Sequence, residues 1–272
     1  MGIHLLHGCA PTWVQHRQSF RNYVPENRLW TYLKSLEQKY VPWSKHGINH
    51  HVLTVDDSTQ GAARACVLAR ELGHHVILFV NPLQIIRQVP YFFSLLDELL
   101  DQCANHTVTY GGIKYELYGL TVTRSLRRVL KADLLTISDE AALQRVRELA
   151  REFDAPDLNI SHHAQTMSID ELREISSLGV EIANHGWSHL EISHLNHEQV
   201  AAHILDGQKW IQQEIGLPAE HYAVPFGTSF VSDAAQVLVR GITMLANSSL
   251  PQGELRPGQW NRFELTEELQ KP

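Results

Sequence analysis

Short apolar runs alternate with amphipathic segments along most of the 272-residue chain. Apolar runs of four to eight residues, bounded by polar residues, predict buried strands, and the segments between them have the apolar spacing of helices. Such an alternation is typical of a mostly parallel α/β fold. The predicted strands are Ile3–His7, His51–Val55, His75–Val80, Val180–Ala183, Tyr222–Val224 and Ile242–Ala246.

Several helices between these strands have readable ends. Thr59–Leu72 begins in a run of capping residues and stops before Gly73, a residue type suited to the left-handed conformation of a helix end. Two further helices each begin at a capping box, in which an N-cap side chain and a Glu or Gln three positions later satisfy free backbone amides. These are Ser168 with Glu171, before a helix over Ile169–Ser177, and Asn196 with Gln199, before a long helix that ends at Gly216.

A stretch from about Pro90 to Asp157 departs from this alternation. Its pattern predicts a helix, a hairpin and two further helices. The hairpin is expected where two β-rich runs join at Gly111 and Gly112. No linker rich in Pro, Gly or Ser brackets the stretch, so we interpret it as a mainly helical insertion within a single domain that spans residues 1–272.

Composition narrows the class of protein. Hydrophobic residues make up 43% of the chain and charged residues 19%, as is usual for globular proteins. The net charge of −7, without a dense basic block, argues against a nucleic-acid partner. No apolar window is long enough to span a membrane, and the N-terminus lacks the pattern of a signal peptide, which predicts a cytoplasmic protein.

Two adjacent carboxylates, Asp56 and Asp57, follow the second predicted strand. Active sites of parallel α/β folds assemble at the carboxyl ends of strands. Neighbouring residues of an extended chain point to opposite sides, so one carboxylate can bind a cation while the other acts as a base. The alternative interpretation is helix capping, because Asp-Asp-Ser-Thr is also a good N-cap sequence.

A histidine pair, His185 and His189, follows a later strand. Residues four apart on one helical turn project to the same side and can offer two nitrogen ligands. A chance pairing is the alternative in a chain with 17 histidines, and spacing alone does not choose between this pair and the nearby His194 and His197. Together with one Asp, the pair forms a three-ligand metal site with open positions, as in hydrolytic rather than structural sites.

In this order the motifs resemble those of the polysaccharide deacetylase family (carbohydrate esterase family 4, the NodB-homology domain). TVDDS at 54–58 looks like the family's TFDDG motif, NHGWSH at 184–189 is similar to its second motif, and YAVPFG at 222–227 resembles its third, F-R-x-P-Y-G. The resemblance covers about Ile3–Val80 and Met167–Ala246. It implies a distorted (β/α)7-type barrel that binds one divalent metal, usually Zn²⁺ with Co²⁺, Ni²⁺ or Mn²⁺ as alternatives, and hydrolyses the acetamide of an N-acetylated sugar or sugar conjugate.

Residue roles follow from the resemblance position by position. It implies that Asp57, His185 and His189 are the metal ligands and that Asp56 is the catalytic base. It also implies that the backbone N–H of Phe226 stabilises the oxyanion and that Gly227 and Trp187 lie at the substrate.

Two departures from the family pattern concern the first and third motifs. Ser58 replaces a Gly after the Asp pair, and Ala223 replaces the Arg that orients the base in the family. Without that cation, we expect the pKa of the Asp56 carboxyl to be raised. Near the C-terminus, we interpret Asn261 and Arg262 as solvated surface residues in preference to a contribution to the barrel mouth.

A third departure concerns the general acid. The family's last motif supplies a His, but no histidine follows His221 in this chain. The candidates for the proton donor are His7, which resembles a His often found on the first strand of such deacetylases, and His162 or His163. A sugar-binding pseudoenzyme and an amidohydrolase for a small non-sugar amide are the alternatives to the deacetylase.

Overall fold

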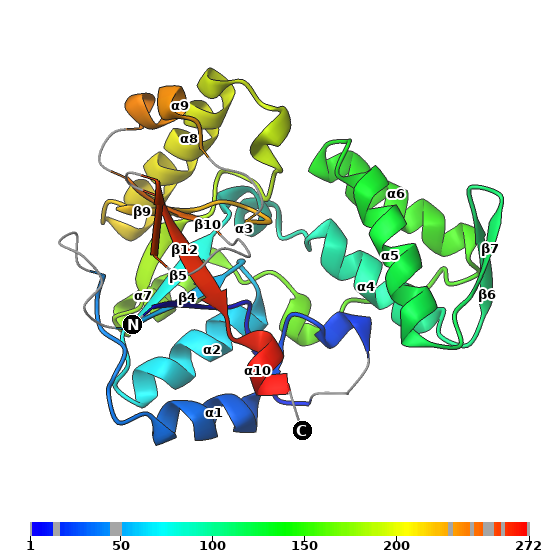
Figure 1. Cartoon of the computed structure of the whole chain (residues 1–272), viewed down its shortest axis with the longest axis horizontal. Helices are drawn as coiled ribbons and strands as arrows, with labels where there is room; N and C mark the ends of the chain where they lie inside the picture. Colours follow the sequence, from blue (N-terminus) through cyan, green and yellow to red (C-terminus); the bar gives the residue numbers. More distant parts are fainter. Residues whose placement is uncertain are drawn as a thin grey trace.

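The computed structural model describes residues 2–12, 17–43, 51–227, 231–239, 242–246, 253–256 and 259–270. Seven parallel strands close into a barrel, because the last of them returns to pair with the first (Figure 1). In barrel order they are β1 (Ile3–Leu6), β4 (Val52–Asp56), β5 (Val76–Val80), β8 (Glu181–Asn184), β9 (His221–Ala223), β10 (Thr243–Ala246) and β12 (Gln259–Glu264). The predicted (β/α)7-type barrel is therefore confirmed.

All six predicted strands are present, and their ends differ from the prediction by one residue. The seventh, β12, is absent from the prediction because its sequence, QWNRFE, contains no apolar run. It completes the barrel by pairing with β1 and β10, and β11 (Gly253–Arg256) adds to it in antiparallel fashion. Since side chains alternate along a strand, Arg262 and Glu264 share one side of β12.

Helices pack on the outside of the barrel. They are α1 (Glu26–Ser35), α2 (Gln60–Glu71), α3 (Pro82–Arg87), α7 (Ile169–Ser177), α8 (His197–Ile215), α9 (Asp233–Leu238) and α10 (Thr266–Gln270). The predicted ends of three of them are confirmed. The Thr59 side chain caps α2, both capping boxes form, and Gly216 ends α8 in the left-handed conformation.

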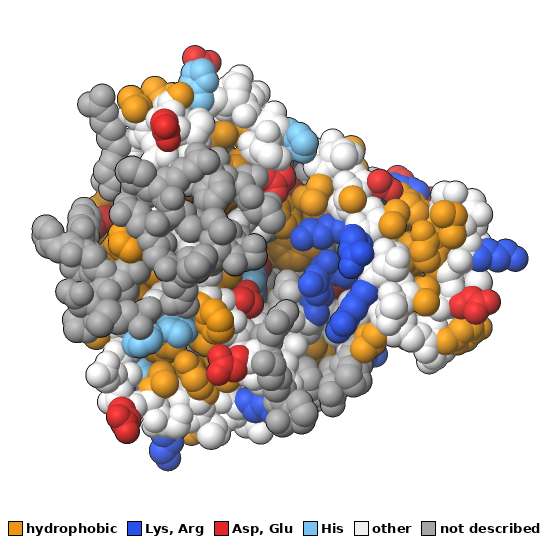
Figure 2. Space-filling view, in the orientation of Figure 1, with side chains coloured by type: hydrophobic (Ala, Val, Ile, Leu, Met, Phe, Trp, Pro, Cys, Tyr) orange, Lys and Arg blue, Asp and Glu red, His pale blue; other side chains and the backbone are white. Residues whose placement is uncertain are grey.

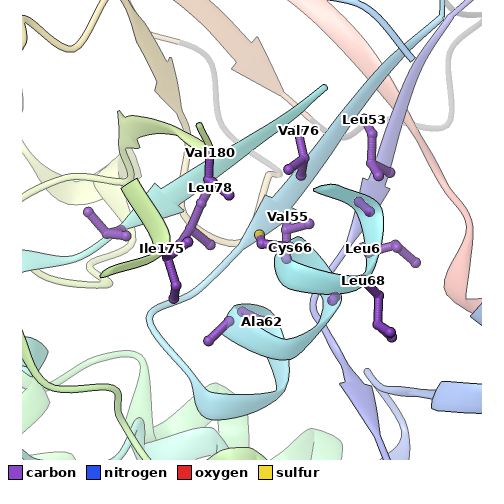
Figure 3. Close-up of a cluster of buried hydrophobic side chains, with 14 of the residues drawn as sticks. Leu6, Leu53, Val55, Ala62, Cys66, Leu68, Val76, Leu78, Ile175 and Val180 are labelled. Atoms are coloured by element: carbon purple, nitrogen blue, oxygen red, sulfur yellow. The ribbon is translucent and has the colours of Figure 1, made fainter. Parts of the chain in front are cut away.

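The core has an outer and an inner part. Ala62 and Cys66 of α2 pack against strand residues such as Val55 in the outer part (Figure 3). A smaller cluster fills the barrel interior and contains Ile3, Val52, Ile77, Phe79, Ala183, Ala223 and Leu245. The tight interior fixes the strands, and with them the side chains that emerge at the strand ends.

Part of the stretch between β5 and β8 forms a lobe beside the barrel (Figure 1). It consists of α4 (Phe92–Gln102), the hairpin β6 (Thr107–Tyr110) and β7 (Ile113–Glu116), α5 (Leu120–Leu134) and α6 (Asp139–Glu152), which is the predicted sequence of elements. The helical lobe, defined here as residues 91–153, has its own cluster of buried apolar side chains. That the chain is a single domain with an insertion stays a prediction.

Candidate active site

A cavity of about 220 Å³ opens where the barrel strands end. His7, Asp56, His185, Phe226 and Glu264 reach it from the ends of five strands, β1, β4, β8, β9 and β12, or from the residues that follow them. The helical lobe also lines the cavity, through α4 and α5. The lobe therefore lies at the barrel mouth, where it borders the cavity.

The adjacent Asp56 and Asp57 both face this cavity. The expectation that an extended strand sends them to opposite sides is wrong, because Asp57 has a φ of 73° and bends the chain where β4 ends. As a result, His185 Nε2 lies 3.9 Å from Asp56 Oδ2 and 3.8 Å from Asp57 Oδ1. A left-handed conformation in a non-glycine residue is costly and is often found at functional sites.

Different partners distinguish the two carboxylates. Both guanidinium nitrogens NH1 and NH2 of Arg262 donate to the Asp56 carboxylate, each at 2.6 Å. Asp57 Oδ1 is buried and accepts no hydrogen bond from the described residues. Burial raises the pKa of the Asp57 carboxyl to about 7. Burial acts in the same direction on Asp56, but the charge of Arg262 outweighs it with help from His185, and the pKa of that carboxyl lies below its usual range.

Two sequence-based expectations about Arg262 and the base are therefore wrong. Arg262 is not a surface residue, since none of its side chain is exposed. Nor does Ala223 leave Asp56 without a cation, because β12 supplies an Arg in place of the one missing from the third motif. A strand over the polar run at 259–264 would have predicted an inward-facing Arg262, because side chains alternate along a strand.

The two histidines of the second motif lie beside Asp57. His185 Nδ1 donates to the Ala223 carbonyl at 2.8 Å, which leaves Nε2 unprotonated and directed at the carboxylates. His189 Nε2 lies 3.4 Å from Asp57 Oδ1. Burial lowers the pKa of His185 to about 4 and that of His189 well below its usual value, so both rings are neutral at physiological pH.

The side chains of Asp57, His185 and His189 fit a divalent metal. One possible ligand atom from each lies within 4.8 Å of the other two, and all three residues are buried. A buried carboxylate oxygen without a hydrogen-bond donor, next to two neutral imidazoles, is the donor set that Zn²⁺ and similar ions take. The structure thus brings the three predicted ligands together, and their role in metal binding stays a prediction.

The loop that carries His185 is fixed by its neighbours. Asn184 Nδ2 donates to the Ile204 carbonyl at 2.7 Å, and Asn184 Oδ1 accepts from the Gly186 amide at 2.8 Å. Gly186 has a φ of 86°, and a Cβ atom there would lie 2.1 Å from His203 Nε2. Glycine is therefore required after the first histidine, for conformation and for space.

Ser58, which replaces the Gly after the Asp pair in the family pattern, belongs to a buried hydrogen-bond network. Its Oγ accepts from the Asn81 amide at 2.8 Å, and its own amide donates to the Tyr91 hydroxyl at 2.7 Å. Tyr91 in turn donates to Asn81 Oδ1, and Asn81 Nδ2 donates to the His185 carbonyl at 2.6 Å. The network therefore connects the Asp motif to the His motif and to the start of the helical lobe.

Among the predicted general-acid candidates, only His7 lines the cavity that contains Asp56. Its Nδ1 lies 3.5 Å from Glu264 Oε2, which comes from the adjacent strand β12. Burial alone would lower the pKa of His7, but the nearby Glu264 carboxylate, with smaller contributions from Asp57 and Asp56, raises that pKa to about 9. His163 instead packs between Phe20 and Tyr23, and His162 lies with it along a different surface groove, so neither reaches the carboxylates.

Phe226 lines the cavity and has a φ of 60°, in the turn after β9. Its ring lies perpendicular to the ring of His189, with 4.4 Å between their centroids. Gly227 follows it in the same turn, and its amide donates to the Val224 carbonyl at 3.0 Å. Trp187 does not line the cavity and packs against the outer core of the barrel.

Comparison with known proteins agrees with these motifs. Residues 156–240 match the profile of the family described as polysaccharide deacetylase. The resemblance to the polysaccharide deacetylases is confirmed. The family and the barrel together support a hydrolase of the deacetylase type. The matched region includes both histidines and the turn at Phe226, while the Asp pair lies outside it.

Solved structures of deacetylases share the fold. The deacetylase PplD of Streptococcus pyogenes superimposes with a TM-score of 0.58 at 10% identity, over 100% of this chain and 98% of that one. A polysaccharide deacetylase of Bacillus cereus superimposes with a TM-score of 0.54 at 11% identity, over 97% of this chain and 64% of that one. A de-N-acetylase of Aggregatibacter actinomycetemcomitans superimposes with a TM-score of 0.51 at 13% identity, over 96% of this chain and 93% of that one. No curated protein matches the sequence. At these identities the similarity demonstrates a common fold alone.

Across the described residues, the structure contains no helix that is both long and apolar enough to cross a membrane.

Proposed function

We propose that this chain is a metal-dependent N-deacetylase that acts on an amino-sugar substrate. The observation that carries the proposal is the composition of one cavity. It combines Asp56, kept ionised by Arg262, with the three candidate metal ligands and with the protonated His7. A general base, a metal site with open positions and a proton donor are the groups that amide hydrolysis needs.

A divalent metal held by Asp57, His185 and His189 would polarise the acetamide carbonyl and lower the pKa of a bound water. Asp56 takes one proton from the water whose oxygen forms a bond to the carbonyl carbon. The Phe226 N–H helps to hold the negative charge that develops on the carbonyl oxygen. When the C–N bond breaks, His7 protonates the leaving nitrogen. The products are acetic acid and the free amine, and the proton on Asp56 returns to His7 through solvent.

Two compensations favour this enzyme over a sugar-binding pseudoenzyme. The base has its cation from Arg262, although the third motif lacks one. The absent C-terminal histidine has a counterpart in His7, paired with Glu264. The S. pyogenes deacetylase of the same fold was solved in complex with acetate, the small product expected here.

The proposal is tested by metal analysis combined with acetate release from N-acetylated sugars. We expect one equivalent of divalent metal, loss of acetate release after chelation, and recovery when Zn²⁺, Co²⁺, Ni²⁺ or Mn²⁺ is added back. A protein that binds one metal and binds sugars, yet releases acetate from no amide, would instead be the pseudoenzyme.

Glu264→Gln should move the alkaline limb of the pH–rate profile to lower pH. Burial alone would lower the pKa of His7, and the Glu264 carboxylate contributes most to raising it to about 9. The imidazolium can donate its proton only below its pKa, so acetate release should decline as the pH rises through that value. Without the carboxylate, the pKa of His7 falls and the decline begins earlier. The measurement is kcat/KM against pH, and an alkaline limb that does not move would rule out His7 as the acid.

A further inference from the structure

Basic side chains gather in the hollow between the barrel and the helical lobe (Figure 2). Arg127 and Lys131 of α5, together with Arg21 from the loop after the 3-10 helix Gln18–Phe20, line the cavity that holds Asp56. Arg127 and Lys131 are four apart and therefore share one face of α5. This basic cluster, defined as Arg21, Arg127 and Lys131, contrasts with the net charge of −7 on the whole chain.

Two carboxylates of α4 hold the cluster in place. Asp97 accepts two hydrogen bonds from the Arg127 guanidinium, and both side chains are buried. One turn further along α4, Asp101 accepts from the amides of Gln18 and Ser19 at 2.7 and 2.8 Å, and from the Ser19 hydroxyl at 2.6 Å. These bonds anchor the segment immediately before Arg21. The cations are therefore positioned by buried contacts of their supporting elements, rather than by chance on a surface.

Among the described residues, the positive charges that line the cavity outnumber their carboxylate partners. Arg262 pairs with Asp56, Arg127 with Asp97, and His7 with Glu264. Arg21 and Lys131 have no carboxylate partner within ion-pair distance in the part of the chain that the structure describes. A bound metal, whose charge the single carboxylate of Asp57 only partly offsets, would increase the positive excess.

Lys131 lies beside the candidate metal ligands through the Phe226 ring. Its Nζ sits 4.3 Å from the centroid of the Phe226 ring, and that ring packs on His189. Burial and the charges of Arg127 and Arg21 lower the pKa of Lys131 to about 8. Placing like charges this close costs stability, and such local conflicts in native proteins are expected at functional sites.

We propose that Arg21 and Lys131 bind an anionic group of the substrate, so that the proposed deacetylase selects N-acylated amino sugars that carry a phosphoryl or carboxyl group. This inference rests on the proposed deacetylase function for its acyl group. The anion supplies the carboxylate-like partner that neither cation has among the described residues. A guanidinium forms paired hydrogen bonds to phosphate or carboxylate oxygens, and an ammonium adds a compact charge.

Binding to the metal-free protein tests the cluster separately from catalysis. Isothermal titration calorimetry would use N-acetylglucosamine 1-phosphate, N-acetylglucosamine 6-phosphate, N-acetylmuramic acid and neutral N-acetylglucosamine. We expect the anionic sugars to bind more tightly than the neutral one, and the stronger of the phosphate and carboxylate arms identifies the group. Arg21→Gln and Lys131→Gln should each weaken anion binding by roughly tenfold, the scale of one charge-assisted hydrogen bond. Arg128→Gln, which removes an exposed cation of the same helix outside the cavity, should have no effect.

Acetate release from the same sugars by the metal-loaded protein gives the second readout. A preference for an anionic sugar that both cluster variants remove, while the Arg128 variant keeps it, supports the inference. Equal kcat/KM for neutral and anionic sugars, unchanged in the cluster variants, would overturn the inference without contradicting the proposed deacetylase function. Anion binding that depends on the cluster, without acetate release from any sugar, would contradict the proposed deacetylase function but support the anion site.

Discussion

Asp56→Asn is expected to reduce acetate release by about a hundredfold or more, the usual contribution of a general base, while the protein still binds its metal. The amide has nearly the same shape as the carboxylate but cannot take a proton from water. The metal should stay because Asp57, His185 and His189 are unchanged. Metal content and the rate of acetate release, measured on the same preparation, check both parts of the prediction.

Asp57→Asn is the matched control, because it makes the same chemical change one residue away. It replaces the carboxylate whose Oδ1 lies 3.4 Å from His189 Nε2 by a neutral amide and should weaken metal binding itself. The Asp56 variant also removes the carboxylate that accepts from the buried Arg262 guanidinium, so thermal unfolding should accompany the assay. Full activity of folded Asp56→Asn protein would exclude Asp56 as the base.

Much of the barrel could be predicted because its signals are local. The six predicted strands are apolar runs, and buried strands of a parallel sheet are apolar on both faces. The helix ends were readable for the same reason, since capping depends on residues three or four positions apart. Ser168 with Glu171 and Asn196 with Gln199 form their reciprocal hydrogen bonds as expected.

Barrel closure was not predictable from such signals. It depends on β12 pairing with β1, which brings Ile3 opposite Arg262 across nearly the whole chain. The β12 sequence lacks an apolar run, and its inward side supplies Arg262 and Glu264 to the cavity that holds Asp56. A residue whose partner is a distant carboxylate has no local signature, and this is why Arg262 was interpreted as solvated.

The site was predicted in part for similar reasons. The resemblance to the family motifs identified His185 and His189 among the 17 histidines as metal ligands, and the structure places them beside Asp57. Trp187 stands between them in the sequence, but the turn directs it into the outer core. The two carboxylates differ through their partners and not through strand alternation, because Asp57 adopts a left-handed conformation that no sequence rule predicts for Asp at this position.

Arg262→Met should move the acidic limb of the pH–rate profile to higher pH. Burial raises the pKa of the Asp56 carboxyl, and the Arg262 charge opposes this most strongly. Without the guanidinium the pKa rises, so a higher pH is needed to ionise the base. The lowered pKa also stabilises the fold above the usual carboxyl pKa. The variant should therefore lose most stability near neutral pH and little at acidic pH, where Asp56 is protonated in both proteins.

Ala223 offers the decisive companion test, because it stands where the family carries its Arg and faces the barrel interior near Phe79. Ala223→Arg alone would place a second buried guanidinium beside one carboxylate and should destabilise the protein. In combination with Arg262→Ala, the new side chain has both space and a partner, so it should move the acidic limb back toward the wild-type position. The limb of the double variant is compared with that of Arg262→Ala. If Arg262→Ala left the limb unmoved, the cation from β12 would not tune the base, and Asp56 would owe its ionisation to another group.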